Sequence, residues 1–333
     1  MRRITKIQII LLMTLGILFP LTYLVNNKNN LNMGFNSENS FINQSLKISK
    51  ISAKIHINNN WSAAQIEGIC NGSGTYSDPY VIEDLVIDGG ERGSCIWIEN
   101  SDVYFKIQNC TFYNAGFAGA GIYLDNTSNG QLINNNCSYN NHMGISLLNC
   151  NNALISGNNA NCNYYSGPLL IYILGKGISL TGTNNTLLLN NNVNYNVYGI
   201  KLYKCNKNVF SENTINNNSN GIVLRSGTYN TLYYNNFTCN SLHAIDDGLN
   251  NQWDSGSIGN YWDNYTGVDN NDDGIGDTPH IIAGTAHSQD NFPIWNDGPE
   301  SKTPTISGFG LFFLLGIHTI LSIIIIKKIR KYH

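Results

Sequence analysis

The residues best suited to chemistry lie in an acidic stretch near the C-terminus. Oxygen ligands are available at positions 1, 3, 5, 7 and 9 of this stretch, from Asp269, Asn271, Asp273, the carbonyl of Ile275, and Asp277. The same positions bind Ca²⁺ in EF-hand loops. The bidentate glutamate of position 12 is missing, and no helices flank the stretch. We therefore expect a weak structural calcium site. The alternative is an Asp/Asn/Gly-rich turn that needs no metal.

The remaining metal-binding and acidic residues do not gather in the sequence. Copper sites use clustered Met, His or Cys side chains, but three of the 4 methionines precede the repeats and the histidines are scattered. The sequence therefore argues against copper. Polysaccharide hydrolysis needs paired carboxylates. Asp125, Glu212, Asp246 and Asp247 occupy different positions in their coils, and the only local cluster is His243 with Asp246 and Asp247. Adjacent strand residues point to opposite faces, so we find no convincing catalytic constellation, and enzymatic activity is left open.

Composition and charge limit the possible functions further. Only 12% of the 333 residues are charged, and the net charge is −3, so nucleic acid is not an expected partner. The 8 cysteines include no Cys-x-x-Cys motif, which leaves a thiolate metal site without support. Cys70 and Cys95 lie in an irregular segment before the repeats and are the two cysteines free to form a disulfide bond.

These residues are positioned by a repeat of about 22 residues. One asparagine series consists of Asn109, Asn135, Asn158, Asn191, Asn213 and Asn235, and a second follows five residues after each of them. A Gly-Ile-x-Leu motif comes next, as at Gly199 and Gly221. The interval from Gly144 to Gly177 is 33 residues long and carries an insertion. A fixed period in this range is typical of a solenoid.

The apolar pattern within each repeat predicts the kind of solenoid. Short β-type runs alternate with Asn, Gly, Tyr and Ser, and no segment shows a helical apolar stripe. This excludes a leucine-rich repeat, and a period of 22 is not a multiple of six, as a hexapeptide helix requires. We predict an all-β, right-handed, single-stranded parallel β-helix with three short strands per coil. Asparagine tolerates tight bends and can bond to the coils on either side, so the asparagine series are interpreted as structural ladders.

Both ends of the chain carry apolar segments. A basic start precedes the apolar run 7–25, which is a signal peptide or an uncleaved anchor. The apolar run 306–326 is long enough to cross a bilayer and is followed by a basic tail. The predicted segments are a signal peptide or anchor (1–25), an Asn/Ser-rich spacer (26–50), a cap with the first coils (51–92), β-helix coils (93–248), a C-terminal cap with the acidic loop (249–298), a linker (299–305), a transmembrane helix (306–326) and a basic cytoplasmic tail (327–333).

The repeats and two tail motifs together resemble a known family. The motifs are GNYWDNY at 259–265 and DDGIGDTP at 272–279. Over about residues 51–297 the chain resembles the NosD-like right-handed β-helix proteins, also called carbohydrate-binding-and-sugar-hydrolase (CASH) proteins. The resemblance implies a β-helix fold. It implies no single activity, because the family includes a periplasmic protein named for copper-site maturation, surface-layer-type proteins and carbohydrate-active enzymes.

The sequence as a whole predicts an exported, membrane-tethered protein with its β-helix at the cell surface or in a periplasm-like space. We expect it to bind a glycan or a surface protein through its lateral face. Two alternatives remain: a carbohydrate-active enzyme (a polysaccharide lyase or hydrolase) and a periplasmic factor for copper or metal-site maturation. A groove with facing carboxylates would favour the enzyme, and three converging His, Met or Cys side chains would favour metal delivery.

Overall fold

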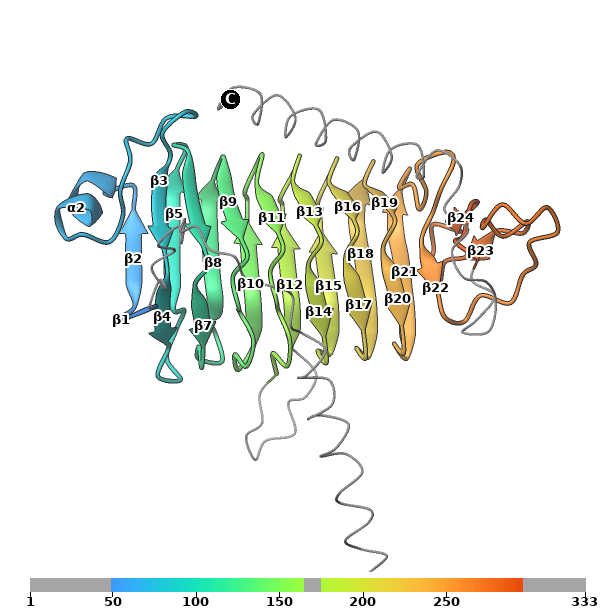
Figure 1. Cartoon of the computed structure of the whole chain (residues 1–333), viewed down its shortest axis with the longest axis horizontal. Coiled ribbons are helices and arrows are strands. Elements are labelled where there is room, and N and C mark those ends of the chain that lie inside the picture. The colour runs from blue at the N-terminus through green and yellow to red at the C-terminus, as the bar shows by residue number, and fades with distance from the viewer. Residues whose placement is uncertain (1–48, 165–174, 296–333) are drawn as a thin grey trace, which may run out of the picture. The chain divides into compact units, whose positions relative to one another are not determined.

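The computed structural model describes residues 49–164 and 175–295, which form stacked coils of β-strands (Figure 1). Strands of successive coils pair in parallel, so the predicted all-β parallel β-helix is confirmed. Within the described ranges, no helix is long and apolar enough to cross a membrane. The predicted N-terminal signal or anchor (1–25) and transmembrane helix (306–326) lie outside the described residues, as does most of the insertion.

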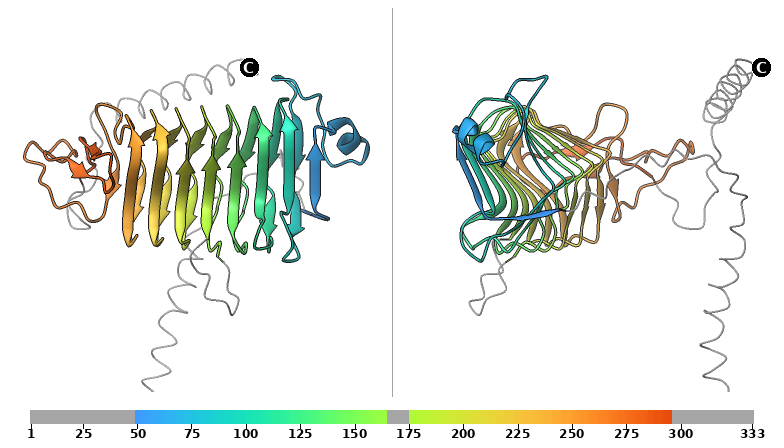
Figure 2. Two further views of the ribbon diagram at one scale, coloured as in Figure 1. Left: turned by 180° about the vertical axis from the view of Figure 1, so that it is seen from behind. Right: turned by 60° about the vertical axis from the view of Figure 1, so that its left-hand side comes forward.

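The longest sheet has eight strands, one from each coil, in parallel order along the solenoid. They are β2 (Ile55–Asn58), β5 (Ile96–Ser101), β8 (Ala120–Thr127), β10 (Met143–Leu148), β12 (Lys176–Thr181), β15 (Tyr198–Tyr203), β18 (Asn220–Thr228) and β21 (Leu242–Leu249). Figure 2 shows the coils side by side from the blue N-terminal end to the orange C-terminal end. This sheet therefore offers a continuous lateral face.

Shorter strands form the other sides of each coil. A seven-stranded sheet contains β3 (Tyr80–Glu83), β6 (Phe105–Gln108), β9 (Gly130–Ile133), β11 (Leu154–Ser156), β13 (Leu187–Leu189), β16 (Val209–Ser211) and β19 (Thr231–Tyr233). The third side contains β1 (Lys50–Ser52), β4 (Leu85–Asp88) and β7 (Thr111–Tyr113) in one sheet, and β14 (Asn192–Asn194), β17 (Thr214–Asn216), β20 (Asn236–Thr238) and β22 (Tyr261–Trp262) in another.

The sequence repeat sets the register between coils. Ile200 in β15 pairs with Ile178 on one side and Ile222 on the other, and all three are fully buried. Side chains alternate between the two faces of a strand, so the apolar positions of successive coils stack into one core. Lys201 lies between the inward residues Ile200 and Leu202 of β15, so it points to the opposite face of the sheet. The same alternation therefore builds the core and decorates the lateral surface.

Buried asparagines form a hydrogen-bonded ladder at one bend of the coils. The backbone N–H and side-chain amide of Asn191 donate to Oδ1 of Asn213, at 3.0 and 2.9 Å. The row runs through Asn135, Asn158, Asn191, Asn213 and Asn235 and continues to Asn260. Each link satisfies backbone groups that have no sheet partner at the bend.

The ladder begins one residue away from the position predicted for Asn109. The backbone N–H of Cys110, not of Asn109, donates to Oδ1 of Asn135 at 3.0 Å. Asn109 is exposed and has a φ of 54°, a left-handed conformation that asparagine tolerates. It therefore forms the turn beside the ladder and is not a member. The second series is shifted in the same way, because Ala115 donates to Asn140.

A short helix lies at one end of the solenoid and an antiparallel strand pair at the other (Figure 1), and aromatic residues pack at both ends. At the N-terminal end, α2 (Trp61–Ile66) buries Trp61, whose ring stacks on Tyr80 with centroids 4.9 Å apart. At the C-terminal end, Phe237 stacks on Trp262 at 4.2 Å. An antiparallel pair, β23 (His280–Ile281) and β24 (Gln289–Asp290), follows there. Both ends of the apolar core are thus covered.

The cysteines are free thiols, including the two that the sequence suggested as a pair. The thiol of Cys95 donates to the carbonyl of Tyr113 at 3.2 Å, and the sulfur of Cys70 lies 4.0 Å from the carbonyl of Trp61. Burial is the main cause that raises the pKa of Cys95 to about 12. The two sulfurs meet different carbonyls, so the predicted disulfide is not formed in the structure.

Candidate functional site

The outward face of the eight-stranded sheet brings together residues from many coils. Parallel register aligns them in two rows. One row contains Trp97, Tyr123, Ser146, Ser179, Lys201, Val223 and Ile245, and the other contains Glu99, Asp125, Leu148, Thr181, Tyr203, Arg225 and Asp247. The early coils contribute aromatic and acidic side chains, and later coils contribute basic ones. The face therefore has two chemically different halves.

The aromatic-acidic half consists of His56, Trp97, Glu99, Tyr123 and Asp125. His56 stacks on Trp97 with ring centroids 4.4 Å apart, and Tyr123 meets Trp97 edge-on at 5.8 Å. The indole N–H of Trp97 is buried and has no acceptor among the residues described. A buried donor without a partner costs about 1–3 kcal/mol.

Two carboxylates flank the rings of this half. Glu99 in β5 lies directly opposite Asp125 in β8, and neighbouring strands are about 4.8 Å apart. Nε2 of His56 lies 2.9 Å from Oε1 of Glu99. Burial, and secondarily the charge of Glu99, raise the pKa of Asp125. The pair thus combines a carboxyl group that holds its proton more readily than usual with a carboxylate held by an imidazole.

Sequence reasoning singled out Asp125 but missed Glu99 and the stacked rings. The signal was present, because Glu99 and Asp125 are 26 residues apart, the same spacing as Asn109 and Asn135. Equal spacing places both carboxylates at one position of successive coils. The four acidic residues considered from the sequence lacked this relation to one another, so no pair was recognised.

The later coils form a groove of about 370 Å³ on the same face. We call it the basic groove; it is lined by Lys176, Ser179, Leu180, Thr181, Lys201, Tyr203 and Arg225. Its three cations come from β12, β15 and β18, which are neighbouring strands. The sequence repeat alone did not indicate this gathering, because the three cations occupy different positions along their strands.

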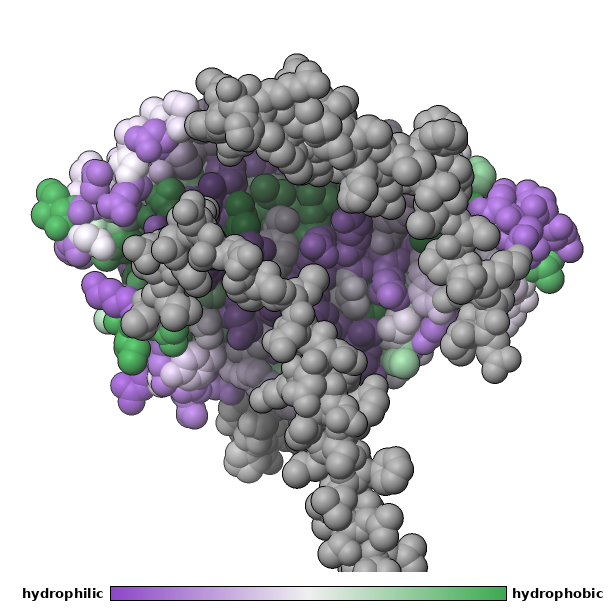
Figure 3. Space-filling model, in the orientation of Figure 1, coloured by the Kyte–Doolittle hydropathy of each residue, from purple (hydrophilic) through white to green (hydrophobic). Residues whose placement is uncertain are grey.

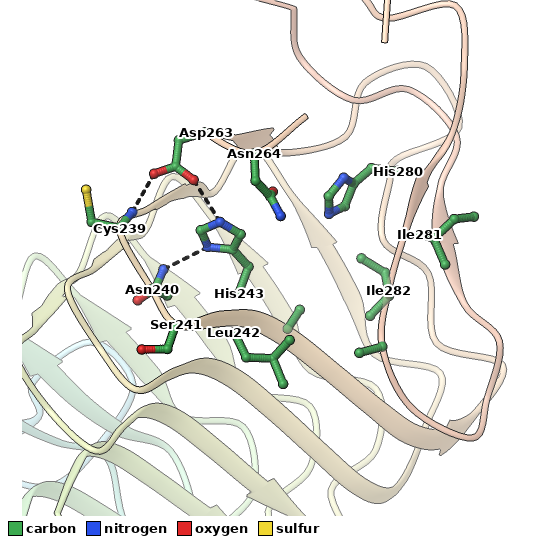
Figure 4. Close-up of a pocket in the computed structure, with 12 residues that line it drawn as sticks. Cys239, Asn240, Ser241, Leu242, His243, Asp263, Asn264, His280, Ile281 and Ile282 are labelled. Carbon is green, nitrogen blue, oxygen red and sulfur yellow. Dashed lines mark hydrogen bonds and ion pairs between the residues drawn. The ribbon is translucent and has the colours of Figure 1, made fainter. Parts of the chain in front are cut away.

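A second concavity, of about 340 Å³, lies at the C-terminal end between the start of β21 and β23 (Figure 4). Nε2 of His243 donates to Oδ1 of Asp263 at 2.7 Å. Nδ1 of His243 accepts from the side-chain amide of Asn240 at 3.2 Å. The orientation of this amide is fixed, because its oxygen accepts from Asn218. Both nitrogens of a neutral His243 are therefore engaged, and neither is available as a general base.

The second histidine of this pocket is also neutral near pH 7. His280 stacks on Trp262 with centroids 4.4 Å apart. Burial, and secondarily the charge of His243, lower the pKa of His280 to about 4. Burial also lowers the pKa of His243, outweighing the opposing effect of Asp263. The pocket is therefore a tightly bonded end of the solenoid rather than a site poised for acid–base chemistry.

The acidic loop predicted to bind calcium lies at the C-terminal end, where hydrophilic residues gather (Figure 3). Asp269 accepts the N–H groups of Asp273 and Gly274 at 3.2 and 2.8 Å. Asp273 accepts the N–H of Ile275 at 2.8 Å, and Asp277 accepts that of Asn270 at 2.8 Å. Asn271 donates to Asp273 at 3.0 Å. These bonds hold a turn around Gly274, and calcium binding stays a prediction.

Groups of metal-ligating side chains are not found in the described part of the chain, and this includes the acidic loop. Over residues 49–164 and 175–295, no three His, Cys, Asp or Glu side chains lie close enough together to hold a metal ion.

Several solved structures match the chain at low sequence identity. The pectate lyase Pel9A is 13% identical, with 78% of this chain and 85% of that chain covered and a TM-score of 0.42. The periplasmic alginate epimerase AlgG is 16% identical, with 59% and 42% covered and a TM-score of 0.35. For the A-module of an Azotobacter vinelandii mannuronan C-5 epimerase these values are 17%, 54%, 57% and 0.37. The chain thus spans less than half the length of the alginate epimerase.

Family comparison gives a more direct assignment. No curated protein sequence matches the chain. The family model described as periplasmic copper-binding protein (NosD) matches residues 73–267, which is more than half of the 333 residues. The match covers the coils that carry the lateral face, except β2 with His56. The chain belongs to the NosD family.

Proposed function

We propose that this protein binds carbohydrate outside the cytoplasm, through the outward face of its eight-stranded sheet. The observation that carries the proposal is the aromatic-acidic half, where Trp97 and Tyr123 lie beside Glu99 and Asp125. Aromatic rings offer rigid apolar surface with a polar edge, and carboxylates accept hydrogen bonds from hydroxyl groups. The family description, a periplasmic protein, supports the extracytoplasmic location.

Substitution of Trp97 tests this proposal. The full-length protein is applied to immobilised neutral and acidic polysaccharides, and retention is measured. We expect Trp97→Ala to weaken binding by about fivefold, because an aromatic contact is worth about 1 kcal/mol. Tyr76→Ala is the matched control, since Tyr76 is 80% exposed and lies outside this face. Equal retention of the Trp97→Ala variant and the parent would reject the proposed surface.

A carbohydrate-active enzyme is the second candidate, and the Glu99–Asp125 pair favours it. A carboxyl group with a raised pKa can donate a proton to a glycosidic oxygen, while a neighbouring carboxylate acts as base or nucleophile. Asp125 would take the first role and Glu99 the second. Activity would appear as new reducing ends in a polysaccharide digest. It should disappear in Asp125→Asn and persist in Asp102→Asn, which changes an exposed carboxylate outside the pair.

The copper named in the family description does not fit the described residues. The two histidines of the C-terminal pocket do not offer a pair of free copper ligands, because both ring nitrogens of His243 are already hydrogen-bonded. Of the 4 methionines only Met143 falls in the described ranges. We therefore propose no copper-dependent step for this chain. Copper titration of the full-length protein, followed by metal analysis after gel filtration, should leave no stoichiometric copper.

The proposal includes attachment to a membrane through residues 306–326, which lie outside the described part of the chain. The length of this apolar run and the basic residues after it support a stop-transfer segment. Protease added to intact cells should then remove the β-helix and leave a tag placed after His333 protected. Digestion of that tag would show that the orientation or the anchor is wrong.

A further inference from the structure

Three cations converge in the basic groove on the later coils. Lys176 is the first residue of β12. Lys201 of β15 lies opposite Ser179 of β12, and Arg225 of β18 lies opposite Tyr203 of β15. Each is further along its strand than the one before, so the charges form a diagonal across neighbouring strands about 4.8 Å apart. The groove has the volume of a binding site, about 370 Å³.

The positive charge of this groove is poorly compensated. Nζ of Lys176 meets only the neutral imidazole of His142, at 3.4 Å, and Nζ of Lys201 lies 4.6 Å from the ring centre of Tyr198. Neither lysine has an acidic partner at ion-pair distance in the described ranges, whereas Arg225 lies 3.9 Å from Asp247. Burial and, secondarily, the neighbouring cation lower the pKa of both lysines. An anion in the groove would relieve this repulsion.

We propose that the basic groove binds an acidic polysaccharide, one that carries carboxylate or sulfate groups along its chain; this rests on the carbohydrate-binding function proposed above. Charge complementarity identifies the anion. The hydroxyl groups of Ser179 and Thr181 and the 43% exposed ring of Tyr203 line the same groove. Hydroxyl donors and an accessible aromatic ring suit a sugar. The net charge of −3 disfavours a nucleic acid, whose binding is dominated by basic surface.

The experiment uses polymers that share one backbone and differ in charge. Binding of the full-length protein to neutral dextran, carboxymethyl-dextran and dextran sulfate is measured by titration. The parent should bind at least one charged polymer more tightly than dextran. The Lys201→Gln/Arg225→Gln variant should lose this preference, with affinity reduced about tenfold or more, because each charge-assisted hydrogen bond contributes more than 1 kcal/mol. Carboxymethyl and sulfate polymers distinguish the two anionic groups.

A second double variant controls for net charge. Lys54→Gln/Lys106→Gln removes the same charge from residues outside the groove and should bind like the parent. The inference is overturned if the groove variant binds charged dextrans as tightly as the parent. It is also overturned if the groove variant loses binding only to anionic vesicles or single-stranded DNA. In either case, polysaccharide binding that is still weakened by Trp97→Ala would leave the proposed carbohydrate-binding function standing. If the parent binds no polysaccharide, both the proposed function and the groove inference are rejected.

Discussion

The middle coils and the C-terminal end solve the same hydrogen-bonding problem with different chemistry. In the middle, neutral amides repeat: Asn191 donates to Asn213, which donates to Asn235. At the end, the first ladder passes to Asn260 and stops on the buried carboxylate of Asp290, at 2.7 Å from the Asn260 N–H. Titratable groups thus appear where the repeat stops.

The other two ladders end in the same way. The second stops where Asn240 donates to His243. A third row, absent from the sequence analysis, runs through Asn208, Asn230 and Asn251 and stops on Asp246, which accepts from Asn251 at 2.9 Å. Each asparagine donates to the following coil, so the last one offers donors and needs an acceptor. Carboxylates and an imidazole nitrogen are acceptors, and this polarity explains why Asp290, His243 and Asp246 stand where the ladders stop.

Removal of one middle asparagine should have the largest effect. Asn213→Leu deprives the Asn191 N–H of its acceptor and the Leu188 carbonyl of a donor. A buried unsatisfied group costs about 1–3 kcal/mol, so we expect the free energy of unfolding to fall by at least that amount. The measurement is chemical denaturation of the full-length protein.

Asn216→Leu provides the control for this ladder prediction. Asn216 is half-buried in β17, and its side-chain oxygen accepts only from the neighbouring side chain of Asn217 within the described hydrogen bonds. Its replacement should change stability little. Equal losses in the two variants would mean that the ladder is no more important than the outer asparagines, and the contrast with the end would fail.

Acid should affect the C-terminal end through His280. Its pKa lies near 4 in the fold, below the ordinary 6.5. The unfolded chain therefore takes up a proton first, and the stability that the neutral imidazole contributes above pH 6.5 is lost as the pH falls towards 4. His280→Phe keeps a ring against Trp262 but cannot titrate. We expect the melting temperature of the parent to fall more than that of this variant across this range.

Asp290 makes the comparison of variants necessary. Burial is the main cause that raises its pKa to about 6, from an ordinary 3.8. The stability that protonated Asp290 contributes is therefore fully present below pH 3.8 and is lost as the pH rises through about 6. This is opposite in direction to the effect of His280. The parent alone would report both effects. Parallel pH profiles of the parent and His280→Phe would remove His280 as a source of acid sensitivity.

The fold was predictable because its determinants repeat. Regular spacing fixed the coil length, and the stacked apolar positions such as Ile200 and Ile222 follow directly from it. Asn109 shows the limit: asparagines at adjacent positions can serve the ladder or the turn, and only the hydrogen bond from Cys110 distinguishes them. Cys70 and Cys95 likewise met carbonyl groups that no spacing rule indicates.

The candidate site was harder to predict because it depends on how residues at different strand positions are aligned between coils. Glu99 and Asp125 become neighbours only when β5 is aligned with β8. The coils that carry Lys176, Lys201 and Arg225 follow the regular 22-residue period, but these residues stand at different positions along their strands, so the repeat does not mark them as neighbours. Neither the Glu99–Asp125 pair nor the basic groove forms a motif of consecutive residues. A search for local motifs therefore finds the acidic loop and misses both.

Calcium should have the smallest effect, and only at the end. Each ionised carboxylate has several acceptor positions, so Asp269 and Asp273 can keep their backbone bonds while presenting oxygen to a cation. Helix-free loops of extracellular proteins bind calcium at roughly 10⁻⁴ to 10⁻³ M, so about 1 mM calcium should add roughly 0.4–1.4 kcal/mol to stability. The melting temperature of the full-length protein should therefore rise relative to chelator.

The loop chemistry makes this prediction specific. Asp273→Ala should abolish the rise, whereas Asp272→Asn removes the same charge from a residue outside the ligand set and should preserve it. Magnesium prefers a smaller octahedral site, so an equal rise with magnesium would indicate general screening of the acidic end. An unchanged midpoint of the parent in calcium would reject the site. The end would then differ from the middle coils only in the acceptors that stop its ladders.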